Sequence, residues 1–224
     1  MSPTARTVIA LLKMIPMNCL FHTFANLVAL LYCHWCYHCY MQLQRLSHEV
    51  KTCLRETFLY PKQIELLQLR RRAIDQIEDL QRNFSFISFL VCIVNFTMCF
   101  SSLGSYLWLS ENSYPFVTID AFYTTFNCLM SLSAIFVVAG QVPIEMENFT
   151  NEFLKKFEHR FFLEPSQDNT RVLEWLLKKP DLVLSGCKVI SYRRSSVLTA
   201  VGTILTYGLL VVNMETRNTK CDKC

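Results

Sequence analysis

Four long stretches without a charged residue alternate with charged segments along the chain, at residues 14–44, 83–110, 121–144 and 195–214. A helix rises about 1.5 Å per residue, so roughly 20 apolar residues cross the ~30 Å hydrocarbon layer of a membrane. Lipid offers the backbone no hydrogen-bond partner, and spanning segments of this kind are therefore helical. The pattern predicts an all-α, polytopic transmembrane helical bundle with four spans.

The charged segments between the spans also carry helical patterns. Apolar residues recur at helical spacing after Pro61, and aromatic residues recur at every fourth position in the later segment. The first set comprises Ile64, Leu67, Ile74, Ile77 and Leu80, and the second comprises Phe149, Phe153, Phe157 and Phe161. We expect long cytosolic helical extensions, of which the second packs on a neighbouring helix. The first helix either packs against a partner helix or stands in solvent as a charged helix, and the sequence leaves both alternatives open.

Composition and charge set the orientation. Hydrophobic residues make up 52% of the 224 residues and charged residues 18%, with a net charge of +4. Lysine and arginine concentrate in segments 45–83 and 143–195, whereas the short connection 111–115 has none. The positive-inside rule places both segments in the cytosol and both chain ends outside. Asn83, Asn95 and Asn148 begin glycosylation sequons, and none of them receives a glycan in this topology.

The expected organisation has six parts. Residues 1–44 form an outer N-terminal segment and the first span, 45–83 a cytosolic helical loop, and 84–142 the second and third spans with a short outer turn. Residues 143–195 form a second cytosolic helical loop, 196–214 the last span, and 215–224 an outer tail. Acidic residues alternate with basic ones in the loops, which argues against a nucleic-acid partner. The expected partner is the lipid bilayer.

The eleven cysteines include a cluster with the spacing of metal sites. Cys33, Cys36 and Cys39, with His34 and His38 between them, fall within the first apolar stretch, where cysteine packs as a small hydrophobic residue. We favour packing over a metal site there, and expect no metal, cofactor or catalytic residue. No Ser-His-Asp set, glycine-rich phosphate loop or carboxylate pair stands out, which argues against an enzyme.

The last apolar stretch places small and polar residues on one helical face. The spacing i, i+4, i+7, i+8 and i+11 joins Gly202, Thr206, Leu209, Leu210 and Asn213. A stripe of this kind in a membrane helix faces protein or water rather than lipid. Composition alone favours helix packing as its role.

A short motif lies within this stripe. Thr206 and Tyr207 are followed by five hydrophobic residues, the amide Asn213 and the apolar Met214. The run resembles the Thr-Tyr-(five hydrophobic residues)-Gln-Phe signature in the seventh span of arthropod gustatory receptors, part of the insect gustatory and odorant chemoreceptor superfamily. Asn213 stands where the family has Gln, and Met214 where it has Phe, so both positions keep their chemical character. The resemblance implies a seven-span chemoreceptor fold with only the last four spans present.

The same resemblance implies a function. It points to a gustatory-receptor-like subunit of a ligand-gated, nonselective cation channel that detects taste or other chemical cues. Such a subunit lies in the plasma membrane as a multi-pass protein with an extracellular C-terminus, and assembles into a homo- or hetero-tetramer. The alternative is a truncated, non-conducting membrane protein that modifies or scaffolds full-length receptors.

Two sets of site residues follow from the resemblance. The pore-lining set is Thr206, Leu209, Leu210 and Asn213. The candidate pocket for a small-molecule tastant is Tyr106, Trp108, Asp120 and Tyr123. Anchoring at the membrane interface is the alternative role for these pocket residues.

Overall fold

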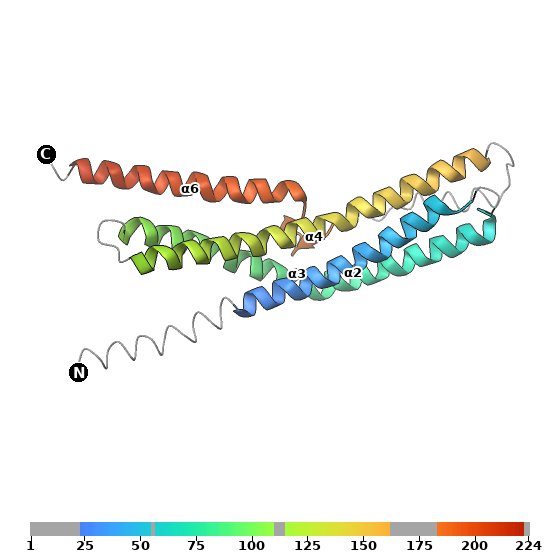
Figure 1. The fold of residues 1–224 in the computed structure, drawn as a ribbon, viewed down its shortest axis with the longest axis horizontal. Coiled ribbons are helices and arrows are strands. Elements are labelled where there is room, and N and C mark those ends of the chain that lie inside the picture. Colours follow the sequence, from blue (N-terminus) through green and yellow to red (C-terminus); the bar gives the residue numbers. More distant parts are fainter. Residues whose placement is uncertain (1–22, 55–56, 110–114, 162–182, 222–224) are drawn as a thin grey trace. The chain divides into compact units, whose positions relative to one another are not determined.

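A computed structural model describes residues 23–54, 57–109, 115–161 and 183–221, which form four helices and a short hairpin (Figure 1). The helices are α2 (Phe24–Thr52), α3 (Tyr60–Leu109), α4 (Pro115–Phe161) and α6 (Arg194–Cys221). The strands β1 (Ser185–Gly186) and β2 (Ile190–Ser191) pair antiparallel. The prediction of a predominantly helical chain is confirmed for the residues described.

Two of the helices are long and apolar enough to cross a membrane. The qualifying stretches are Tyr60–Gly104 in α3 and Ala121–Glu158 in α4, whose most apolar windows have mean hydropathies of 2.0 and 1.6. Only 28% and 39% of these windows are buried within the chain, so much of their apolar surface faces outward. Of the four predicted spans, two therefore meet this test of length and composition, and those in α2 and α6 stay predictions.

The helix boundaries differ from the predicted segment boundaries in three places. Helix α3 is continuous across residues 83 and 84, and α4 continues through Pro143, so each predicted span shares a single helix with its predicted cytosolic extension. Pro143 cannot donate a backbone hydrogen bond, but Val142 and Met146 on either side of it are buried, and this packing holds the helix together. Helix α6 extends past Met214 to Cys221.

The predicted break at Pro61 is confirmed. Helix α2 ends at Thr52 and α3 begins at Tyr60, which places Pro61 in the first turn of α3. The missing N–H of a proline has no helical partner in a first turn, so the residue is accommodated there without loss of a bond.

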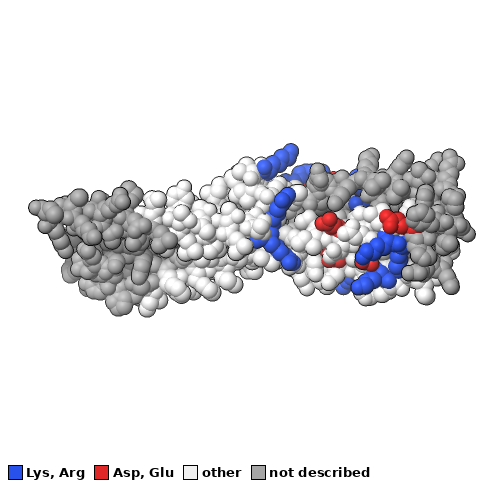
Figure 2. All heavy atoms as spheres, turned by 90° about the horizontal axis from the view of Figure 1, so that it is seen from above, with Lys and Arg blue, Asp and Glu red and all other residues white. Residues whose placement is uncertain are grey.

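The described residues divide into two compact units. The apolar unit comprises 23–32, 87–109, 115–135 and 195–221, and the charged unit comprises 33–54, 57–86, 136–161 and 183–194. Charged side chains gather on the charged unit, as Figure 2 shows for one face. The side chains described in the apolar unit include no Lys, Arg, Asp or Glu.

The apolar unit has a small core and an apolar surface. Cys99 of α3, Cys128 of α4 and Ile204 of α6 are buried together. Large apolar side chains on its surface include Phe24, Leu90, Phe122, Phe126 and Leu198, which are 43–78% exposed. The surface of this unit is therefore apolar where the surface of a water-soluble domain is polar.

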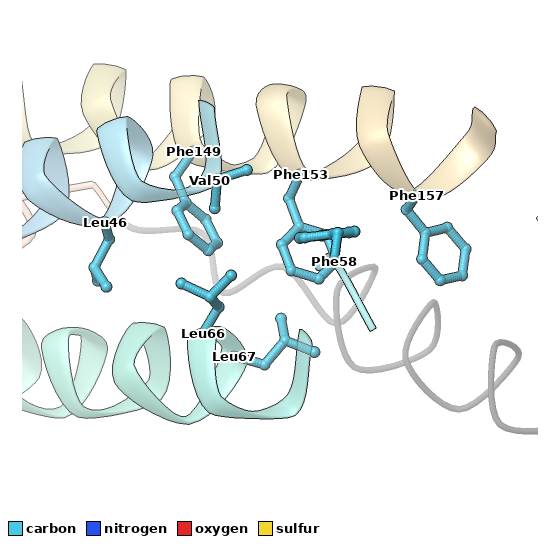
Figure 3. Close-up of a cluster of buried hydrophobic side chains, with 8 residues drawn as sticks. All are labelled: Leu46, Val50, Phe58, Leu66, Leu67, Phe149, Phe153 and Phe157. Atoms are coloured by element: carbon cyan, nitrogen blue, oxygen red, sulfur yellow. The ribbon is translucent and has the colours of Figure 1, made fainter. Parts of the chain in front are cut away.

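The charged unit has an aromatic and aliphatic core (Figure 3). Phe153 of α4 is fully buried, with its ring 5.2 Å from that of Phe58 and 5.9 Å from that of Phe149. The cluster comprises Leu46, Val50, Phe58, Leu66, Leu67, Phe149, Phe153 and Phe157. Burial of each large side chain stabilises the fold by about 1.5–3 kcal/mol. The predicted aromatic face is confirmed, and the segment after Pro61 packs rather than standing free in solvent; the side chain of Phe161 lies outside the described part.

A hairpin lies within residues 143–195, which the sequence predicted to be a helical loop. Cys187 and Lys188 have φ values of 52° and 60°, and the amide of Val189 donates to the carbonyl of Gly186 at 2.9 Å. Positive φ at both central residues defines a type I′ turn, whose twist matches that of paired strands. Neither residue is glycine or asparagine, so propensity gave no signal for this turn.

Candidate functional site

Helix α6 presents two different faces within the apolar unit. Ala200 and Ile204 are buried, and Ile204 joins the core with Cys99 and Cys128. Successive helical residues are about 100° apart, so Gly202 and Thr206 lie nearly opposite to Ala200 and Ile204. Gly202 and Thr206 are exposed.

The predicted pore-lining stripe falls on the exposed face as far as its side chains are described. A Cβ added to Gly202 would meet nothing within 4 Å. The hydroxyl of Thr206 donates to the carbonyl of Gly202 at 2.8 Å, and Leu210 is 52% exposed. The side chains of Leu209, Asn213 and Met214 lie outside the described part. Gly202, Thr206 and Leu210 therefore form an open stripe that is exposed within the part of the chain that the structure describes.

The motif residue Tyr207 lies at the edge of this stripe. It is 57% exposed, and its ring meets that of Phe100 on α3 edge to face, with centroids 5.9 Å apart. Gly208 packs more closely, because a Cβ there would lie 3.8 Å from Cδ1 of Leu103. The aromatic contact and the small residue together seat α6 against α3.

The candidate ligand pocket stays a prediction. Tyr106 and Trp108 lie in α3 and Asp120 lies in α4, but their side chains are outside the described part. Tyr123 of α4 is 68% exposed.

The start of α6 is fastened to α3 through the hairpin, within the charged unit. The amide of Gln81 and the hydroxyl of Ser85 both donate to the carbonyl of Ser185, the latter at 3.0 Å. The Ser85 hydroxyl also accepts from the backbone amide of Cys187 at 2.8 Å. These hydrogen bonds fix β1 and the turn of the hairpin, whose second strand, β2, leads into the last helix.

Helix α4 supports the same connection. Gly140 is buried, and a Cβ there would lie 3.2 Å from the backbone nitrogen of Arg194, the first residue of α6. Beside it, the rings of Phe136 and Tyr192 are 5.7 Å apart. The sequence analysis did not single out Gln81, Ser85 or Gly140. Gly140 offered the one available signal in the sequence, because a glycine inside a long helix often marks a place where another backbone segment approaches closely.

Charged side chains bind the three helices of the charged unit to one another. Lys62 of α3 forms ion pairs with Glu49 of α2 at 2.6 Å and with Glu65 at 3.0 Å. Hydrogen bonds to these carboxylates raise the pKa of Lys62, and the bond to Glu49 has the larger effect. The protonated Lys62 therefore stabilises the folded state. This stabilisation is fully present at a pH below 10.5, the ordinary pKa of lysine, and is lost as the pH rises through the raised pKa. Lys156 of α4 donates to the carbonyls of Lys51 at 3.0 Å and of Cys53, at the C-terminal end of α2. A cation is favourable there because helix C-termini carry partial negative charge.

Arg70 is buried on the core-facing side of α3. Its side chain is only 4% exposed, and neither Nε nor Nη2 has a hydrogen-bond partner among the residues described. Burial lowers the pKa of Arg70.

The cysteine and histidine cluster in α2 is divided between buried and exposed positions. Cys36 and Cys39 are buried, whereas His34 and His38 are exposed. Among the residues described, no group of three or more Cys, His, Asp or Glu side chains gathers as metal ligands do. Burial of Cys36 and Cys39 agrees with a packing role.

Comparison with known proteins identifies no relative. A scan against protein-family models found no match, and a search of curated proteins found none. The resemblance of the last helix to gustatory receptors therefore stays a prediction.

Proposed function

We propose that this chain is a gustatory-receptor-like, multi-pass membrane protein that acts as a subunit of a ligand-gated, nonselective cation channel. Helix α6 lines the pore of a tetramer, with Thr206, Leu209, Leu210 and Asn213 toward the axis. Both charged segments lie in the cytosol and the C-terminus is extracellular. The ligand is a small-molecule tastant.

The observation that carries this proposal is the open stripe on α6. Gly202, Thr206 and Leu210 are exposed while the opposite face packs on α3 and α4. Small and polar residues on one face of a membrane helix commonly face protein or water rather than lipid, and the proposed pore face adds the amide of Asn213 to this stripe. In a tetramer, four copies of Leu210 form a hydrophobic constriction and four copies of Asn213 a polar ring beside it.

The apolar unit supports the membrane part of the proposal. Its described side chains carry no formal charge, and aromatic and aliphatic side chains cover its surface. A contiguous apolar surface of this kind marks contact with lipid or protein. The charged unit, in contrast, has the ion pairs and polar surface of a domain in water.

The first test is whole-cell current in cells that express this chain, with surface labelling to confirm delivery. We expect a cation current in the wild type, and Asn213→Ala to change its size or its relative permeability to small and large cations. The control is Asn127→Ala, which removes an amide from α4 rather than from the last helix and should leave permeability unchanged.

The result also separates the two candidate functions. A current that Asn213→Ala alters supports a pore lined by the last helix. Protein at the cell surface that carries no current, alone or with a candidate tastant, contradicts conduction by this chain. The modifier or scaffold function then takes precedence.

A further inference from the structure

A groove of about 250 Å³ lies between α2 and α3 within the charged unit. Polar side chains from both helices line its walls: Gln42, Arg45 and Glu49 from α2, and Arg72 and Gln76 from α3. Small and aliphatic residues form the rest of the lining. Binding pockets for drug-sized ligands measure about 300–1,000 Å³, so this groove suits a smaller group.

The groove holds more positive than negative charge. Neither Arg45 nor Arg72 has an ion-pair partner among the residues described. The single carboxylate in the lining, Glu49, is already bound to Lys62 at 2.6 Å. Two guanidinium groups that share one groove repel each other, and a bound anion would remove that repulsion.

The lining has the chemistry of a phosphate site. A guanidinium offers a planar fork of N–H donors that binds phosphate oxygens in pairs. Gln42 and Gln76 add amide donors from the two helices. We propose that this groove binds a phosphate monoester, held between Arg45 and Arg72.

The position of the groove along the chain limits the source of the phosphate to two. Gln42 lies at the end of the segment that holds the first predicted span, residues 1–44, and Arg45 follows it on the side that the proposed topology places in the cytosol. A phosphorylated membrane lipid therefore reaches the groove from the bilayer, and a soluble phosphate monoester reaches it from the cytosol. The inference does not depend on ion conduction, because it concerns binding to the charged unit.

The test uses the full chain purified in detergent and two probes that carry the same chemistry. Calorimetric titration measures binding of soluble inositol trisphosphate, and native mass spectrometry measures retention of phosphatidylinositol bisphosphate over phosphatidylserine. We expect wild-type protein to bind at least one probe, and Arg45→Gln and Arg72→Gln each to weaken binding about tenfold, as loss of a charge-assisted hydrogen bond does. Retention of the lipid alone identifies a headgroup site, whereas binding of both probes shows that the free phosphate monoester suffices.

The matched control is Arg71→Gln. It removes the same charge one residue away, but Arg71 is paired with Asp75 at 3.0 Å and does not line the groove. We expect its affinity to stay within about twofold of the wild type, since exposed charges contribute little. Equal weakening by Arg71→Gln would show general electrostatic attraction and overturn the proposal, as would wild-type protein that binds neither probe. Arg45 and Arg72 lie on different helices, so misfolding of one variant, detected by circular dichroism, leaves the other as the test.

Discussion

Burial of Arg70 imposes a cost on the charged unit at the scale of a single residue. Two of its guanidinium nitrogens have no partner among the residues described, although the side chain is almost inaccessible to solvent. A buried ionised group is costly unless it is paired and fully hydrogen-bonded. Leu67 and Ile74, one turn to either side on α3, are buried as well, so an apolar side chain of similar length suits this position.

We expect Arg70→Met to raise the thermal unfolding temperature of the purified protein. Apolar replacement of a buried charge is neutral or stabilising by about 1–4 kcal/mol. Arg71→Met is the control, because that exposed, ion-paired side chain should change the free energy of unfolding by about 0.5 kcal/mol or less. A lower unfolding temperature for Arg70→Met than for the control would contradict a net cost of burying Arg70.

At the scale of the element, the contact between α4 and the start of α6 depends on Gly140. The backbone nitrogen of Arg194 lies 3.2 Å from the position of a Cβ on Gly140. A backbone atom moves less readily than the end of a flexible side chain, so Gly140→Ala must displace the connection between the hairpin and α6. We expect Gly140→Ala to destabilise the protein by about 1–3 kcal/mol, as overpacking does, measured by thermal unfolding followed by circular dichroism.

The control for this prediction is Gly104→Ala in α3. A Cβ at Gly104 meets nothing within 4 Å. The substitution should therefore stabilise the helix by about 0.5–1 kcal/mol, the usual gain of alanine over glycine in a helix. If both substitutions stabilise the protein equally, the backbone at Arg194 moves away from the added methyl group at no energetic cost, and the prediction is wrong.

The elements also show how far the sequence alone leads. Long charge-free stretches and the four-residue spacing of Phe149, Phe153 and Phe157 correctly predicted helices and a buried aromatic face. The hairpin escaped prediction because long-range hydrogen bonds from Gln81 and Ser85 hold it, and local propensity does not encode such partners. The groove residues escaped prediction for the same reason, since Arg45 and Arg72 line one groove only when α2 and α3 pack. Helical spacing placed Gly202, Thr206 and Leu210 on one face of α6, and that face is exposed; its role as a pore lining stays a prediction.

At the scale of the whole molecule, orientation in the membrane is the testable property. The proposed topology places Cys221 and Cys224 outside the cell and Cys53 in the cytosol. We expect a membrane-impermeant maleimide to label the protein on intact, mildly reduced cells, and the double substitution Cys221→Ser with Cys224→Ser to abolish that signal. Cys53, which is a free thiol, should react only after permeabilisation.

The opposite labelling pattern would contradict this topology. Cys53→Ser serves as the control, because it should leave the signal on intact cells unchanged. A glycan on Asn148 would contradict the orientation independently. That side chain is exposed on α4 and is bonded to Glu145 at 3.1 Å, so it would be accessible to modification if it faced the outside.

The aromatic core of the charged unit also has a consequence for biosynthesis. Leu46 and Val50 leave the ribosome about 100 residues before Phe149, and two predicted spans are made in between. At roughly 5–20 residues per second, the earlier helices wait on the order of 5–20 s for the third. During that interval their apolar faces are uncovered, in the proposed topology on the cytosolic side, where newly made chains aggregate or bind chaperones. A nascent chain that stalls before Phe149 therefore exposes a surface that quality control recognises.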